Sequence, residues 1–205
     1  MFISVIIPTY NRAHLIAGTL DSILAQKYQD FEIIIVDDGS TDDTEMVVAS
    51  YLSDNVSYYK KENGERGAAR NFGASKAKGT YLNFFDSDDI AYTNHLEVAN
   101  RFYGEAKNSS KVLHSSYIFE REGDGEDVVI QTGILNKKIQ LGNSLSCNNV
   151  FIDKAVFTKK ASLKNYSGFE FNLGIEREIA VLSKSEIQQE LGLDAIDDAI
   201  KTVAY

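Results

Sequence analysis

Short apolar segments alternate with helical patterns over the first 110 residues. Four segments are apolar on both faces and predict buried strands: residues 3–8, 31–38, 56–60 and 80–85. Apolar or alanine residues at helical spacing predict helices at 15–26, around Met46 to Leu52, at 67–79 and at 93–107. Strands of this kind that alternate with helices favour an α/β fold, in which helices cover both faces of a parallel sheet.

The pattern changes after residue 110. Residues 111–121 and 126–135 are separated by an acidic turn and predict a small antiparallel pair. Apolar residues in 183–205 recur at nearly helical intervals, which predicts an amphipathic helix interrupted near Gly192. A chain of 205 residues fits one compact domain, here composed of a half 1–110 and a half 111–205.

Composition excludes several classes of function. A formal net charge of -9 disfavours binding to nucleic acid, because most of the molecule would repel a phosphate backbone. Cys147 is the single cysteine, so neither an internal disulfide nor a cysteine-rich zinc site is expected. No apolar run is long enough to span a bilayer and no secretory signal is present, so we expect a cytoplasmic location and leave peripheral membrane contact open.

Polar clusters follow three of the predicted strands. They are PTYN at 8–11, DDGS at 37–40 and DSDD at 86–89. We expect Ser40 or Thr41 to cap the helix that follows the second cluster. The carboxyl ends of parallel strands meet at one edge of a sheet, where open α/β folds bind ligands, so the three clusters are expected to converge there.

The crowded carboxylates favour a divalent cation. Acidic side chains within a few ångströms of one another repel unless a cation neutralises them. Aspartate oxygens without cysteine or clustered histidine select Mg²⁺ or Mn²⁺ rather than zinc. These ions keep coordination positions for phosphate oxygens, so the pattern predicts a diphosphate site, although the chain has no glycine-rich phosphate loop of the GxxxxGK[ST] type.

Four blocks in this order and spacing closely resemble family 2 glycosyltransferases: SVIIPTYNR, QKYQDFEIIIVDDGSTD, NGERGAARNFG and GTYLNFFDSDD. The resemblance is strong over residues 2–100 and weaker in CNNVFIDKAVF at 147–157. It implies the GT-A fold, a Rossmann-like and mostly parallel sheet with helices on both sides, here with a small antiparallel C-terminal part. It also implies that the first half binds a nucleoside-diphosphate sugar and that the second half contributes the acceptor side.

The resemblance assigns residues to the nucleotide. Pro8, Tyr10 and Asp38 would hold the nucleobase, with Asp38 accepting a hydrogen bond from a base N–H. Arg70 would lie near the base or the diphosphate, and Gly67 would let the backbone pass close to the ligand. Uridine is the base that the family analogy favours.

The acidic turn completes the donor site in this resemblance. Asp86 would face the ribose, Ser87 would belong to the same binding set, and Asp88 would be the main ligand of Mn²⁺ or Mg²⁺ in a DxD signature. The implied reaction is metal-dependent transfer of the sugar to an acceptor hydroxyl with inversion, as in polysaccharide biosynthesis. The metal would offset the charge that develops on the departing nucleoside diphosphate.

The resemblance places the general base in the second half of the chain. In the family, an acidic pair follows a GF segment, and here Gly168 and Phe169 are followed by no Glu-Asp pair. Glu176 or Glu178 would take this role, depending on register. A surface helix of alternating charge is the alternative for these residues.

Two other functions fit parts of the pattern. A chain that keeps the nucleotide half but lacks the base would be a nucleotide-sugar-binding module without turnover. The strand followed by DSDD also fits a phosphatase of the haloacid-dehalogenase type, although that motif normally ends the first strand. The acceptor, an unknown glycan or lipid-linked molecule, and the oligomeric state are not readable, and Asn148 and Asn149 could contact acceptor hydroxyls or simply form a turn.

Overall fold

The computed structural model describes residues 1–105, 112–114, 117–119, 128–130 and 147–163. The elements in chain order are β1 (Ile3–Thr9), α1 (Ile16–Leu24), β2 (Phe31–Asp37), α2 (Thr44–Ala49), β3 (Val56–Lys60), α3 (Glu65–Lys76), β4 (Tyr81–Phe84), α4 (His95–Glu105), β5 (Val112–His114), β6 (Tyr117–Phe119), β7 (Val128–Ile130), the 3-10 turn η1 (Cys147–Asn149), β8 (Val150–Asp153) and α6 (Lys154–Leu163).

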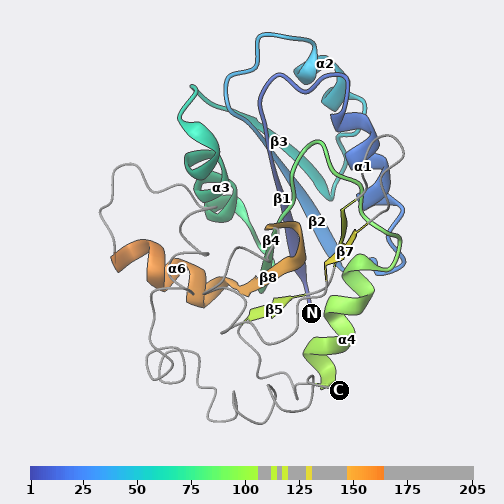
Figure 1. The fold of residues 1–205 in the computed structure, drawn as a ribbon. Helices are drawn as coiled ribbons and strands as arrows, with labels where there is room; N and C mark the ends of the chain where they lie inside the picture. The colour runs from blue at the N-terminus through green and yellow to red at the C-terminus, as the bar shows by residue number, and fades with distance from the viewer. Residues whose placement is uncertain (106–111, 115–116, 120–127, 131–146, 164–205) are drawn as a thin grey trace.

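Six strands form one mixed sheet in the order β3-β2-β1-β4-β8-β5 (Figure 1). The first four are parallel, and their register aligns Thr9 at the end of β1 with Asp37 at the end of β2. β8 inserts antiparallel between β4 and β5, so the second half of the chain extends the sheet. β6 and β7 pair antiparallel in a separate two-stranded sheet, which confirms the predicted pair.

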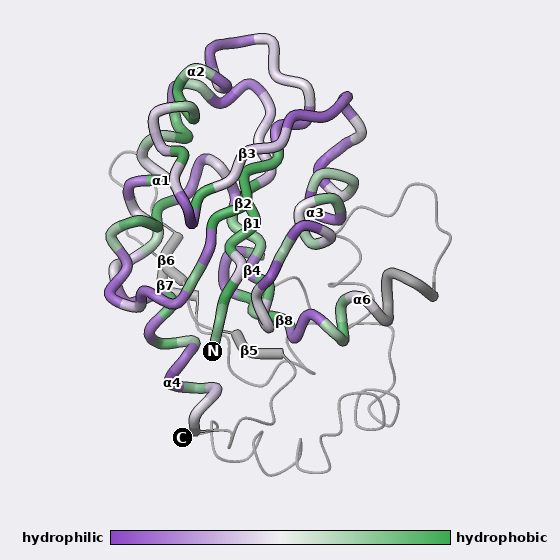
Figure 2. The backbone as a smooth tube through the Cα atoms, turned by 180° about the vertical axis from the view of Figure 1, so that it is seen from behind, coloured by the Kyte–Doolittle hydropathy of each residue, from purple (hydrophilic) through white to green (hydrophobic). Residues whose placement is uncertain are grey.

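Alternating side chains of the central strands build two cores. One face of β1 and β2 packs with α1, α2 and α4 through buried residues such as Ile7, Leu20 and Leu96. The other face packs with α3, where Ile6 and Val36 belong to the same cluster as the alanines of that helix. Figure 2 shows the central strands as the most hydrophobic part of the backbone, with hydrophilic loops around them. This arrangement confirms the predicted parallel sheet with helices on both faces.

Helix α3 approaches β1 closely at Gly73. A Cβ built on Gly73 would lie 2.4 Å from Cγ2 of Ile6 and 3.1 Å from Cγ2 of Val36. Only a residue without a side chain allows this separation between helix and sheet. The close approach fixes α3 against the strands whose ends carry the polar clusters.

Some predicted boundaries differ from the structure. Ser40 and Thr41 do not cap α2, since the carboxylate of Asp42 accepts the backbone N–H of Thr44 at 3.1 Å. The hydroxyl of Ser40 instead accepts the backbone N–H of Asn11. Helix α3 begins at Glu65, earlier than predicted, because Gly64 precedes it as its N-cap. The predicted C-terminal helix lies outside the described residues, and no helix among the described residues is long and apolar enough to cross a membrane.

Candidate functional site

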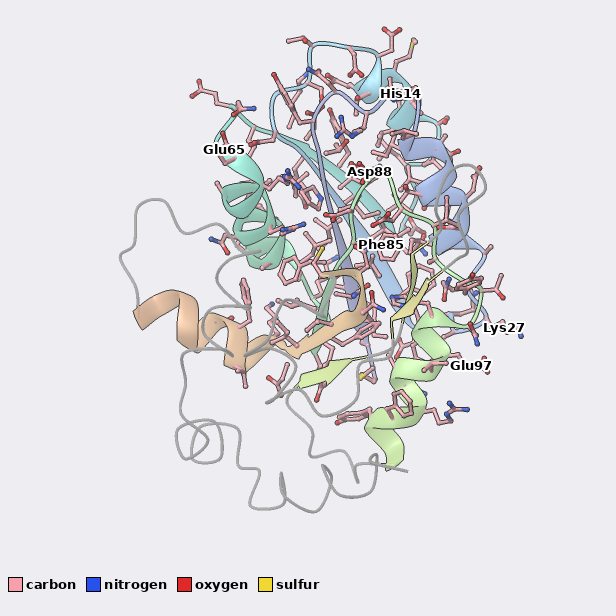
Figure 3. The ribbon with its side chains drawn as sticks, in the orientation of Figure 1. His14, Lys27, Glu65, Phe85, Asp88 and Glu97 are labelled. Atoms are coloured by element: carbon pink, nitrogen blue, oxygen red, sulfur yellow. The ribbon has the colours of Figure 1, made fainter. Side chains whose placement is uncertain are left out.

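A cavity of about 300 Å³ lies at the carboxyl ends of β1, β2 and β4, beside the start of α3. Figure 3 shows Asp88 and Glu65 toward this end of the sheet, whereas Lys27 and Glu97 lie toward the other end. The lining residues come from all three predicted polar clusters and from the segment around α3: Pro8, Thr9, Tyr10, Arg12, Asp38, Asn63, Glu65, Arg66, Ala69, Asp86, Ser87 and Asp88. The predicted convergence of the clusters is therefore present.

The loops after β1 and β2 are joined directly. The backbone N–H of Asn11 donates to Ser40 Oγ at 2.9 Å, and the Asn11 side chain accepts the N–H of Thr41 at 2.9 Å. The buried carboxylate of Asp37 accepts the N–H of Ser40 at 2.7 Å and the hydroxyl of Tyr58 at 2.5 Å. These bonds hold the DDGS turn in place beneath the cavity.

Asp38 is buried and has a cationic partner. Nζ of Lys61 lies 2.5 Å from its Oδ1, and the backbone N–H of Gly64 donates to the same oxygen at 3.0 Å. The Oδ2 oxygen accepts a longer bond of 3.2 Å from Gly64 and has capacity for a further donor. Lys61, which is not among the lining residues, therefore compensates the charge of Asp38.

Asp86 pairs with a different basic residue, Arg70. Nη2 of the fully buried Arg70 lies 2.5 Å from Asp86 Oδ1. The thiol of Cys147 donates to Oδ2 at 3.2 Å, and burial is the main reason that the pKa of this thiol rises to about 12. Cys147 is thus a neutral and weak hydrogen-bond donor to Asp86.

Asp88 and Arg12 face each other at the cavity wall. Nε of Arg12 lies 3.4 Å from Asp88 Oδ2, and the two side chains are 41% and 44% exposed. Asp38, Asp86 and Asp88 therefore each have their own basic side chain. These basic partners reduce the repulsion among the carboxylates, and the expected metal ion stays a prediction.

The last acid of the turn is held differently. The side-chain amide of Asn148 donates to the Asp89 carboxylate, and its oxygen accepts the backbone N–H of Asp86 at 2.8 Å. Burial is the main cause that raises the pKa of Asp89, with the neighbouring carboxylates adding to it and Asn148 opposing it. Asn148 therefore spans the turn from its first residue to its last.

The carboxylates of the cavity could supply few ligands to a divalent ion. No three His, Cys, Asp or Glu side chains of the described residues gather into a group that could hold a metal ion. Asp88 lines the cavity with a half-exposed carboxylate. Mg²⁺ and Mn²⁺ are commonly held by one or two carboxylates, with water and substrate phosphates as the other ligands. Asp88 fits that role, with Arg12 as the group that an ion would displace.

Residues 4–141, about two thirds of the chain, match the model of the glycosyl transferase family 2. The chain belongs to glycosyl transferase family 2. Residues 146–205 match a second model, described as a family of unknown function (DUF6786). The family match argues against the phosphatase alternative, and so does the position of the acidic turn after β4 rather than after the first strand.

Curated relatives match more than half of this glycosyltransferase family chain. An uncharacterized glycosyltransferase of Rickettsia typhi is 39% identical over 115 residues, which cover 56% of this chain and 36% of the relative. The minor teichoic acid biosynthesis protein GgaB of Bacillus subtilis is 31% identical over 172 residues, covering 79% of this chain and 18% of its own length. The chain thus spans well under half of each of these relatives.

A solved structure supports the GT-A fold of this family 2 glycosyltransferase. Residues 1–349 of TarS from S. aureus, crystallised in complex with UDP-GlcNAc, match with a TM-score of 0.66 and 30% identity. The match covers 78% of this chain and 48% of the TarS chain. The mostly parallel sheet and its helices therefore agree with the fold that the sequence resemblance implied.

The predicted site residues of this glycosyltransferase family member fall into three groups. The lining includes six of them: Pro8, Tyr10, Asp38, Asp86, Ser87 and Asp88. Arg70 and Gly67 are buried in α3 and are absent from the lining, so Arg70 supports Asp86 from beneath. Glu176 and Glu178 lie outside the described residues.

Sequence reasoning missed several residues of the cavity. Arg12 follows the PTYN cluster directly, and Glu65 and Arg66 stand inside the NGERGAARNFG block, so their positions in known blocks were an available signal. Lys61 had no such signal, because its role depends on contact with a residue 23 positions away. In the lining, Arg12 and Arg66 oppose four acidic side chains, and Lys61 and Arg70 add cationic partners from outside it.

Proposed function

We propose that this chain binds a nucleoside-diphosphate sugar in the cavity and takes part in transfer of the sugar to an acceptor hydroxyl. The observation that carries the proposal is the convergence of Asp38, Asp86 and Asp88 on one cavity, each with a basic partner. A uridine nucleotide is favoured, because TarS, at 30% identity, was crystallised with UDP-GlcNAc. Membership of the glycosyltransferase family supports the same reaction class.

The nucleobase is assigned to the wall formed by Pro8, Tyr10 and Asp38. Tyr10 is 46% exposed although it is a large aromatic residue, and it lines the cavity. An exposed ring of this kind provides a flat apolar surface on which a base can stack. Asp38 Oδ2 retains capacity to accept a hydrogen bond from a base N–H. Asp86, oriented by Arg70, would face the ribose.

The diphosphate is assigned to the basic residues of the lining. Arg12 and Arg66 line the cavity and present two guanidinium groups to an anionic ligand. Asp88 would hold Mn²⁺ or Mg²⁺, which when bound acts as a Lewis acid that stabilises charge on the departing diphosphate. Arg12 can then exchange its carboxylate partner for a phosphate oxygen.

Transfer is proposed to proceed by direct displacement with inversion. The acceptor oxygen forms a bond to the anomeric carbon while the bond from that carbon to the diphosphate oxygen breaks. A carboxylate takes the acceptor proton, and Glu176 or Glu178 is proposed for this role from the family resemblance alone. The name of GgaB, a teichoic acid biosynthesis protein, supports a surface polysaccharide as the acceptor class.

A second candidate is a donor-binding module without turnover. Two observations favour it: the family match ends at residue 141, and the segment with Glu176 and Glu178 lies within the match to the family of unknown function. The chain also covers less than half the length of these curated relatives.

Binding and turnover are tested in two stages. A thermal-shift screen of UDP, GDP, CDP and dTDP sugars with and without Mn²⁺ should show a metal-dependent rise in Tm for one base, with calorimetry of wild type and Asp88→Ala as confirmation. Asp88→Ala should lose the metal-dependent part of binding. Absence of a metal-dependent shift for every nucleotide would reject the proposal. Binding without donor hydrolysis or transfer across a broad acceptor panel would favour the binding module.

A further inference from the structure

The side chain of Asn148 makes two hydrogen bonds to one short turn. Its oxygen accepts the backbone N–H of Asp86 at 2.8 Å, and its amide nitrogen donates to the carboxylate of Asp89. A backbone N–H can only donate and an ionised carboxylate can only accept, so both contacts require one orientation of the amide. Asn148 is buried, its oxygen also accepts a longer contact of 3.5 Å from the thiol of Cys147, and the residue is absent from the cavity lining.

The backbone of Asn148 is itself bonded to β4. The side chain of Asn83, fully buried in β4, donates to the backbone oxygen of Asn148 at 2.8 Å and to that of Val150 at 3.1 Å. Residues 150–153 then pair with β4 in the main sheet. The hydrogen bonds of Asn148 therefore connect the acidic turn to the rigid centre of the sheet rather than to another loop.

The two hydrogen bonds bracket the residues that face the cavity. Asp86, Ser87 and Asp88 all line it, and Asn148 contacts the backbone of the first of them and the side chain of the residue that follows the last. Rotation of the turn would change the direction of both cavity-facing carboxylates. We propose that Asn148 is a positioning residue that fixes the acidic turn for nucleotide binding, an inference that rests on the proposed function.

The sequence left two alternatives for Asn148, contact with acceptor hydroxyls or a role in a turn, and its contacts favour the second. Its side chain is absent from the cavity lining, and it contacts the carboxylate of Asp89 and the N–H of Asp86 instead. A leucine would fill a similar volume without either bond. An aspartate would keep an acceptor for Asp86 but would place a second carboxylate against Asp89.

A reciprocal exchange of the two side chains tests the role. Asn148→Asp places two carboxylates in contact, and we expect the Kd for UDP in saturating Mn²⁺ to rise about tenfold. The double variant Asn148→Asp/Asp89→Asn restores one donor and one acceptor in exchanged positions. It should recover a Kd within about threefold of wild type, since the geometry of the pair is retained. Calorimetry of the whole chain measures each Kd.

Hydrogen exchange of the Asp86 amide provides a readout without nucleotide. We expect its protection to fall about tenfold in Asn148→Asp and to return in the double variant. Asn55→Asp is the charge-matched control, because Asn55 is exposed and lies before β3, at the end of that strand away from the cavity. It should change neither the Kd nor the protection. Urea unfolding of each variant confirms that binding is compared between folded proteins.

The outcomes separate this inference from the proposed function. Wild-type affinity in Asn148→Asp, or no recovery in a folded double variant, would overturn the positioning role while leaving nucleotide binding intact. If wild type binds no nucleotide, the proposed function fails, and the exchange data then assign Asn148 a purely structural role. Loss and recovery of both Kd and protection would support the proposal.

Discussion

Nε of Arg12 lies 3.4 Å from Oδ2 of Asp88, so a protein cation contacts the carboxylate that the DxD pattern assigns to a metal ion. Both side chains are about two-fifths exposed, and ion pairs of this kind contribute at most about 1 kcal/mol. The contact is therefore weak enough for a divalent ion to replace. Without a divalent ion, Arg12 balances the negative charge of Asp88.

Arg12→Gln should separate binding of the ion from binding of the nucleotide. Removal of the competing guanidinium should raise the affinity for Mn²⁺ alone by about two- to fivefold. The same change should weaken binding of UDP without metal, because one cation of the cavity is lost. Electron paramagnetic resonance of free Mn²⁺ and calorimetry with UDP measure the two effects.

Arg66→Gln is the matched control for Arg12→Gln. It removes the same charge from the same cavity, but Arg66 has no ion pair with Asp88 among the described residues. Equal gains in Mn²⁺ affinity for both variants would mean that general cavity charge, rather than the Arg12–Asp88 contact, controls access of the ion.

Glu65 begins α3 with a backbone φ of 71°, a left-handed conformation that is unfavourable for a residue with a side chain. Glu65→Gly should be more stable than Glu65→Gln by about 1 kcal/mol, because glycine adopts this conformation without steric cost. Both variants remove the same negative charge from the cavity, so both should bind UDP more tightly than wild type. Urea unfolding and calorimetry measure the two effects, and equal stability of the two variants would contradict the strain.

The sheet and the convergence of the acidic clusters could be predicted because they depend on local patterns. Parallel strands end at the same edge, so PTYN, DDGS and DSDD had to meet once the alternation was recognised. The basic partners could not be predicted in the same way. Lys61 and Arg70 reach their carboxylates through tertiary contacts, and nothing in their local sequence distinguishes a buried partner from a surface charge.

The contribution of the second half of the chain to the main sheet could not be predicted from the sequence either. The segment 150–153 is apolar and short, and local pattern alone does not indicate that it inserts antiparallel between β4 and β5. The role of Asn148 depends on that insertion, because β8 brings the residue next to the acidic turn. The expected base residues Glu176 and Glu178 remain predictions.

Lys61 compensates the buried charge of Asp38 at a separation of 2.5 Å. Lys61→Met should destabilise the protein by about 2 kcal/mol, because it leaves a carboxylate that is 6% exposed without its cation. The double variant Lys61→Met/Asp38→Asn should recover most of that loss, since the neutral amide needs no counter-charge. A double-mutant cycle in urea measures the coupling, and additive effects would show that the pair contributes little.

His95 gives the fold a specific dependence on acid. Its ring packs between Phe85 and Phe151, and burial lowers its pKa to about 4 from an ordinary value of 6.5. Between pH 6.5 and pH 4 the unfolded chain therefore binds a proton that the folded protein excludes. The free energy of unfolding consequently falls as the pH falls through this interval, by up to about 3 kcal/mol from this group.

His95→Phe should unfold with a shallower dependence on pH between 6.5 and 4. His14→Gln is the control for loss of an imidazole, because His14 is exposed. Equal slopes for wild type and His95→Phe in denaturant titrations across this range would show that the acid sensitivity arises from other groups.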